Sequence, residues 1–132
     1  MKSLTAFLNP KRKPNLKFIL SDAFQDEKGN PILWEMRQLT AAEGMEMQKE
    51  LQSKEYMDIM LAYVANSLVY PDLRDAELLK GLSQREGRSI LSPTEALRVM
   101  VTDAELAKLV DEYTRFNDLT GDFSKKAEEA KN

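Results

Sequence analysis

The chain has 132 residues with no cysteine and no histidine, which excludes disulfides, thiolate chemistry and histidine-based catalysis or metal binding. Its 19 basic and 22 acidic residues leave a net charge of −3, so no strong overall field favours nucleic acid or an anionic membrane. We expect one domain without a cofactor, because this length with 42% hydrophobic residues supplies a core and no segment approaches the roughly 18 apolar residues of a membrane span.

Residues 1–15 predict a flexible N-terminal arm. Two prolines bracket a basic cluster at residues 11–13, and the apolar side chains at helical spacing are Leu4, Phe7 and Leu8. A single short turn of helix fits there. The basic cluster could contact phosphates, but without interleaved aromatic residues a solvated arm is the simpler interpretation.

Residues 16–37 predict a β-hairpin. Two extended apolar runs, 16–20 and 32–37, flank a polar connection that contains a chain-reversal signal. In the second run, alternate residues share a face. The face expected to pack carries Ile32, Trp34 and Met36. The opposite face carries Leu33, Glu35 and Arg37. Because two strands alone are barely stable in water, we expect the apolar face to lie on helices.

Five helices are expected after the hairpin, near residues 41–53, 55–69, 75–81, 93–101 and 103–118. Three of them begin with a Ser/Thr-x-x-Glu capping box, in which the hydroxyl accepts from a helical amide and the glutamate bonds back to the cap amide. These boxes start at Thr40, Ser92 and Thr102. The second helix is the most hydrophobic, and its apolar residues cover more than one stripe, so it should form the centre of the core.

The predicted fold class is therefore mainly α with a small N-terminal β-hairpin, an α+β fold in which a compact bundle of about five helices packs on the hairpin. Residues 16–121 would form a single globular domain, with the hairpin at 16–37 and helices across 41–118. Residues 122–132 are charged without apolar periodicity, which predicts a polar, mobile tail. The segment 84–89 has a similar composition and is expected to be solvated.

No residues are spaced for catalysis or metal binding. Asp72, Asp75 and Glu77 form the densest acidic cluster, but acidic residues also suit the first turn of a helix, where the dipole favours negative charge. The polar residues between 22 and 30 lack the alternating oxygen ligands of a calcium loop. The sequence therefore predicts that the protein is no enzyme and has no catalytic, cofactor-binding or metal site.

Two local patterns carry a family resemblance. The first is a Gly29-Asn30-Pro31 turn followed by Trp34-Glu35-Met36-Arg37, and the second is the block from Tyr70 to Leu78. In this order and spacing they resemble the XkdN-like family of phage tail assembly chaperones, over roughly residues 4 to 132. The chain departs from the family pattern where a Pro-Gly-Glu helix start is expected, but the capping box at Thr102 does the same physical work.

The resemblance implies a non-catalytic phage or prophage tail assembly chaperone that acts in the bacterial host cytoplasm and is absent from the mature virion. The implied partners are the tail tube protein and the tape measure protein, with neither nucleic acid nor membrane. The residues also leave two alternatives open. One is a generic helical protein–protein adaptor, and the other is a small regulatory nucleic-acid-binding protein that uses the basic arm.

The candidate partner-binding surface is the expected helix break at residues 70–75, because a proline there stops the central helix. Its members are Tyr70, Pro71, Asp72, Leu73, Arg74 and Asp75. Tyr70 and Leu73 would lie at an exposed corner beside charged residues, or would close the core; both alternatives stay open.

Methionines form a second candidate surface, because flexible thioethers suit an irregular partner. Met45 and Met47 lie two apart on an expected helix and cannot share a face closely, so one of them is expected to be exposed. Met57 and Met60 are expected to fill gaps in the core.

Overall fold

An antiparallel sheet lies near the N-terminus of the computed structural model, which describes residues 3–119. Strand β1 (Leu16–Ile19) pairs with β2 (Leu33–Met36), as the predicted hairpin requires. Trp34 and Met36 are buried whereas Leu33 is exposed, which confirms the predicted faces of the second strand.

A third strand, β3 (Leu68–Tyr70), pairs with the other side of β2, where the sequence predicts the end of a helix. The helix instead ends at Ser67, whose carbonyl accepts a hydrogen bond from the amide of Arg37 at 2.8 Å. A Leu-Val-Tyr run suits a strand, and the open side of β2 supplies its hydrogen-bond partners. A register shift beside Glu35 places Tyr70 opposite that residue. The prediction of helix through residue 69 is therefore wrong at its last two positions.

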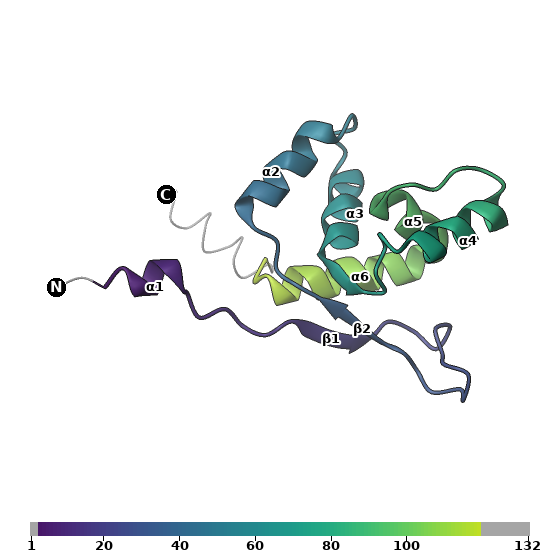
Figure 1. Ribbon diagram of the computed structural model, residues 1–132, viewed down its shortest axis with the longest axis horizontal. Coiled ribbons are helices and arrows are strands. Elements are labelled where there is room, and N and C mark those ends of the chain that lie inside the picture. Colours follow the sequence, from purple (N-terminus) through teal and green to yellow (C-terminus); the bar gives the residue numbers. More distant parts are fainter. Residues whose placement is uncertain (1–2, 120–132) are drawn as a thin grey trace.

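Six helices are present within residues 3–119 (Figure 1). They are α1 (Thr5–Leu8), α2 (Ala41–Glu50), α3 (Tyr56–Ser67), α4 (Ala76–Glu86), α5 (Pro93–Met100) and α6 (Asp103–Phe116). The capping boxes at Thr40 and Thr102 form in full, and the Ser92 hydroxyl caps α5. With the small antiparallel sheet, these helices confirm the predicted α+β fold class.

Helix α4 continues to Glu86, beyond the predicted end near residue 81. It stops at Gly87, which has a φ of +71° in the left-handed region that favours glycine at the end of a helix. Residues 84–89 are exposed, as predicted, but their first three residues are helical. The polar composition of residues 84–86 gave no sign of helix, because the last buried side chain of α4, Leu82, lies before them.

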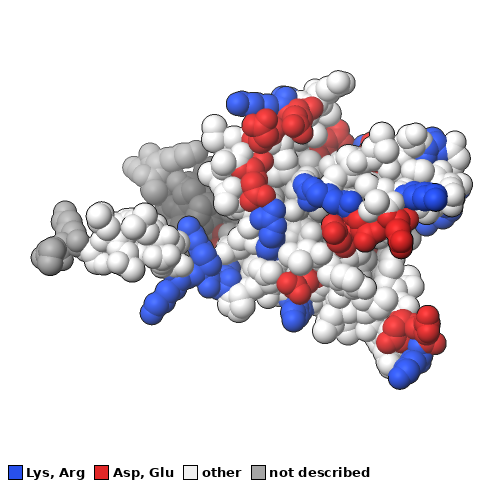
Figure 2. Space-filling view, in the orientation of Figure 1, with Lys and Arg blue, Asp and Glu red and all other residues white. Residues whose placement is uncertain are grey.

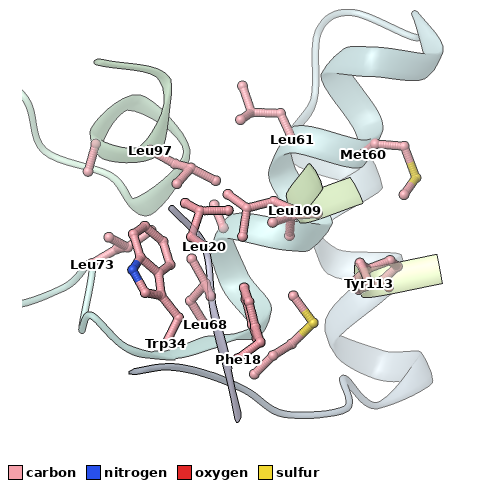
Figure 3. Packing of buried hydrophobic residues seen from close by; sticks show 14 of the residues in the cluster. Phe18, Leu20, Trp34, Met60, Leu61, Leu68, Leu73, Leu97, Leu109 and Tyr113 are labelled. Carbon is pink, nitrogen blue, oxygen red and sulfur yellow. The ribbon is translucent and has the colours of Figure 1, made fainter. Parts of the chain in front are cut away.

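Helix α3 lies at the centre of the helical layer, in contact with α2, α5 and α6. The core forms between this layer and the inner face of the sheet. Figure 3 shows Phe18 and Trp34 from the sheet in the same cluster as Leu97 and Leu109 from α5 and α6. The Trp34 ring meets Phe24 edge-on, with ring centroids 5.0 Å apart. The predicted packing of the hairpin on helices is confirmed.

The arm extends away from this body, with α1 near its end (Figure 1). Its base is attached through Asn15, which donates to Glu35 Oε2 at 3.0 Å, and through Lys13, which pairs with Asp118 at 3.1 Å. The single helical turn expected in the arm is present. Flexibility of the arm stays a prediction, and the expected tail at 122–132 lies outside the described residues.

None of the helices described in residues 3–119 is both long and apolar enough to cross a membrane.

Candidate functional site

The corner at residues 70–75 joins β3 to α4, and its acidic side chains stabilise the backbone. Asp72 accepts a hydrogen bond from the amide of Arg74 at 3.0 Å. Asp75 is the N-cap of α4 and accepts from the amides of Glu77 and Leu78. These bonds form a turn and a helix start, so the local structure accounts for both carboxylates.

Tyr70 and Leu73 lie in different environments. Leu73 is 1% exposed and belongs to the core cluster that contains Trp34. Tyr70 is 54% exposed, and the half-buried Pro71 follows it through a cis peptide bond. Of the two alternatives left open by the sequence, the exposed corner therefore applies to Tyr70 and closure of the core applies to Leu73, because the chain turns after β3 and directs Leu73 inward.

Apolar side chains gather around Tyr70 on the outer face of the sheet. Ile19 and Leu33 are cross-strand partners and are 43% and 54% exposed. Tyr70 lies opposite Glu35, two residues along β2 from Leu33, which places Tyr70 diagonally across from Leu33. We call Ile19, Leu33 and Tyr70 the outer-face patch. The alternation of β2 already placed Leu33 on this face, but Ile19 and the pairing of β3 were missed.

A groove, which we call the α2 groove, runs between α2, α3 and the start of α5. Two adjoining hollows of about 310 and 250 Å³ form it, and both are lined by Met47 and Arg74. One volume lies near and the other below the lower limit of about 300 Å³ for small-molecule pockets, so the groove suits side chains of a polypeptide. The structure thus brings together two predicted site residues from distant parts of the chain.

The lining of the α2 groove is mixed, with apolar side chains in one hollow and mainly polar and acidic side chains in the other. The apolar lining comes from Met47, Leu51, Ala62 and Pro93. Three glutamates on one side of α2 line the rim: Glu43, Glu46 and Glu50. Across from them, Arg74 donates to Asn66 Oδ1 at 2.6 Å. Figure 2 shows acidic side chains gathered over α2. Because Glu43 is paired with Arg37, the groove retains Glu46 and Glu50 against the Arg74 guanidinium, a small excess of negative charge.

Met45 lies outside this groove. It is 66% exposed beside Gln48, Lys49 and Lys54, whereas Met47 is half-buried. The two methionines thus differ in exposure, as their spacing predicts. Among the other pair, Met60 is buried as expected, but Met57 is 47% exposed. It lines a hollow between α3 and the junction of α5 with α6, so its core assignment is wrong.

An ion pair fixes the start of α2 against the sheet. Arg37 Nη1 donates to Glu43 Oε1 at 3.0 Å, and Nη2 pairs with Oε2 at 2.5 Å. These bonds, with the hydrogen bond from the Thr40 amide, lower the pKa of Glu43 from 4.5 to about 2. The glutamate is consequently charged at neutral pH, and the groove wall is held in place by Arg37, the residue that follows β2.

The other carboxylates with a lowered pKa also lie in local structures. Hydrogen bonding by the Asn30 amide lowers the pKa of Asp26 in the hairpin turn, and hydrogen bonding by Ser21 lowers that of Glu105 in its capping box. In residues 3–119, no three acidic side chains are grouped to hold a metal ion. What the described surface offers is apolar and charged area for contact with another polypeptide.

Comparison with known proteins identifies the family. A family model described as phage XkdN-like tail assembly chaperone protein matches residues 4–131. The chain belongs to this family. No curated protein matches it in a sequence search. The crystal structure of the protein yqbn is similar, with a TM-score of 0.68 and 19% identity, covering 89% of this chain and 98% of that chain. At this identity the likeness supports the fold alone.

An XkdN-like tail assembly chaperone acts during assembly of the phage tail, a non-catalytic role played through contacts with other proteins. Three exposed features of the described chain suit such contacts: the outer-face patch, the α2 groove and the apolar turn of the arm. The roles of residues 70–75, Met45 and Met47 in binding stay predictions.

Proposed function

We propose that this chaperone binds the tail tube and tape measure proteins of its phage or prophage, covers their association-prone apolar surfaces until assembly begins, and catalyses no reaction. It acts in the bacterial host cytoplasm and is absent from the finished particle. The observation that carries the proposal is the family match over residues 4–131. The contacts themselves are argued from the surface of the chain.

The outer-face patch is the surface that we assign to these clients. Complete burial of a Leu or Ile side chain contributes about 1.5–3 kcal/mol, and the patch residues are about half exposed. Covering Ile19, Leu33 and Tyr70 would therefore contribute about 3 kcal/mol in total. A contact of this strength, surrounded by polar residues such as Lys17 and Glu35, suits a chaperone that must release its client.

The outer face of the sheet is more accessible to a client than either edge of the sheet. At the edge formed by β1, the carbonyl of Ile19 already accepts a hydrogen bond from Lys108 Nζ of α6 at 2.9 Å. Strand β3, at the opposite edge, is only three residues long. Short or covered edge strands discourage the addition of another strand. A client is thus expected to lie across the outer-face patch.

Co-purification tests the proposal. The tagged full chain is co-expressed with the tail tube protein or the tape measure protein of the same phage or prophage, and we expect each client to be retained and to stay soluble. Failure of both clients to bind would overturn the proposed function. Mass spectrometry of purified particles should detect no stoichiometric amount of the chaperone, and finding it there would refute its absence from the virion.

A double variant tests the assigned surface. Leu33→Ala with Tyr70→Ala should weaken client retention by about tenfold or more, as expected for the centre of an interface. The matched control is Leu91→Ala, which truncates a side chain that is 80% exposed between α4 and α5. If the double variant retains clients as well as the control does, the outer-face patch is not their binding surface.

A further inference from the structure

The arm presents an apolar turn that has no counterpart in its own body. Leu4, Phe7 and Leu8 are 74%, 82% and 74% exposed. Their spacing places them on one side of α1, because residues three and four apart are neighbours on a helix. The basic cluster at residues 11–13 follows directly. The arm therefore combines an exposed apolar helical turn with adjacent positive charge.

The α2 groove has the complementary character. Its lining contains apolar side chains, including Met47 and Leu51, and its rim carries Glu46 and Glu50 in exposed positions. An apolar segment flanked by cations would bury its side chains between the helices and place its charges beside these carboxylates.

The other hollows of the described chain fit the arm less well. The hollow lined by Met57 contains Asp58 and Asp103, and Asp58 pairs with Arg98 at 3.7 Å. One carboxylate thus lies outside that ion pair, whereas the α2 groove offers two, Glu46 and Glu50. The hollow at the base of the arm is lined by cations, Arg12, Lys13 and Arg37, which would repel another basic segment. Charge complementarity thus selects the α2 groove.

Geometry favours a groove on another molecule. The contacts of Lys13 and Asn15 hold the base of the arm, and Figure 1 shows α1 directed away from the body, with α2 lying between it and α3 and α5 in this view. Residues 3–12 span about 26 Å with α1 intact, since an extended residue adds about 3.3 Å and a helical residue about 1.5 Å. Such a segment can reach across to a neighbouring copy, whereas docking on its own groove requires a reversal around α2.

We propose that the chain associates with itself by arm exchange: α1 of one copy inserts Phe7 and its apolar neighbours into the α2 groove of a second copy, and Lys11 and Arg12 lie beside Glu46 and Glu50. Each copy carries one arm and one groove, so the contact is between unlike surfaces and can close as a reciprocal dimer or as a ring. It uses neither Ile19, Leu33 nor Tyr70 and is independent of client binding.

Sedimentation velocity of the full chain tests self-association at increasing concentration and at two salt concentrations. Phe7→Ala should weaken association by about tenfold or more, as for an aromatic anchor. The pair Glu46→Lys and Glu50→Lys should weaken it similarly. Leu91→Ala is the matched control and should associate like the wild type. Raising the salt concentration should weaken wild-type association, because it screens exposed charges.

Mixing the two defective variants gives the decisive result. Phe7→Ala retains an intact groove, and the double lysine variant retains an intact arm. Each variant is therefore expected to associate weakly alone, and the mixture is expected to form a mixed complex at concentrations where each alone is mainly monomeric. All of these side chains are exposed, so circular dichroism should show unchanged folding. A wild-type chain that stays monomeric to about 1 mM, a Phe7→Ala variant that associates normally, or a mixture without complex would each overturn arm exchange.

Discussion

Replacing Glu43 by glutamine should reduce stability at neutral pH and reduce it progressively less as the pH falls. The carboxylate has a pKa of about 2 in the folded chain, against an ordinary value of 4.5, because Arg37 and the Thr40 amide donate to it. A depressed pKa means that the stabilisation is fully present above about pH 4.5 and is lost as the pH falls through the folded value.

The shift sets an upper limit of about 3 kcal/mol, since each pKa unit corresponds to about 1.4 kcal/mol. Solvent reduces this value, because the side chains of Arg37 and Glu43 are 35% and 39% exposed. We therefore expect Glu43→Gln to lower the free energy of unfolding by about 1 kcal/mol at pH 7.

Urea unfolding between pH 7 and pH 3, followed through the fluorescence of Trp34, measures this difference. Trp34 is the single tryptophan of the chain and is 1% exposed, so its signal reports the core. Glu105→Gln is the matched control, because Glu105 occupies the equivalent capping box of α6 without an arginine partner and should show the smaller effect. A Glu43→Gln deficit that does not shrink between pH 5 and pH 3 would refute the assigned cause.

Three further predictions concern the corner and α4. Leu73→Ala should lower the free energy of unfolding by about 3 kcal/mol because it leaves a cavity in the core, whereas Tyr70→Ala should change it by no more than about 0.5 kcal/mol. Urea unfolding measures both values, and similar values would contradict the different burial of the two side chains. Asp75→Ala should cost about 1 kcal/mol through loss of the cap of α4, visible as a lower melting temperature, and an unchanged value would show that the cap contributes nothing. Gly87→Ala should lower the free energy of unfolding by about 1 kcal/mol, because a φ of +71° strains any residue with a Cβ. The added Cβ meets no atom within 4 Å, so this strain is the whole expected cost, and a neutral result in thermal unfolding would contradict it.

Interactions between residues close in sequence determined many of the element boundaries and faces of this fold. The capping boxes at Thr40 and Thr102 placed the starts of α2 and α6, because the hydrogen bonds of a capping box join residues only three apart. Alternation along β2 placed Trp34 and Met36 in the core and Leu33 outside it, because successive side chains of a strand point to opposite faces. The family resemblance, carried by short motifs in a defined order, is likewise a property of the sequence.

Only the tertiary structure decided the last residues of α3 and the surfaces that follow from them. Residues 68–70 suit either a helix end or a strand, and the unpaired side of β2 selects the strand. That choice exposes Tyr70, buries Leu73 and completes the outer-face patch. The meeting of Met47 with Arg74 in the α2 groove also depends on how α2 packs on α3, which no local pattern encodes. Contacts between distant segments depend on the shape of the assembled core, whereas caps and alternation act within a few residues.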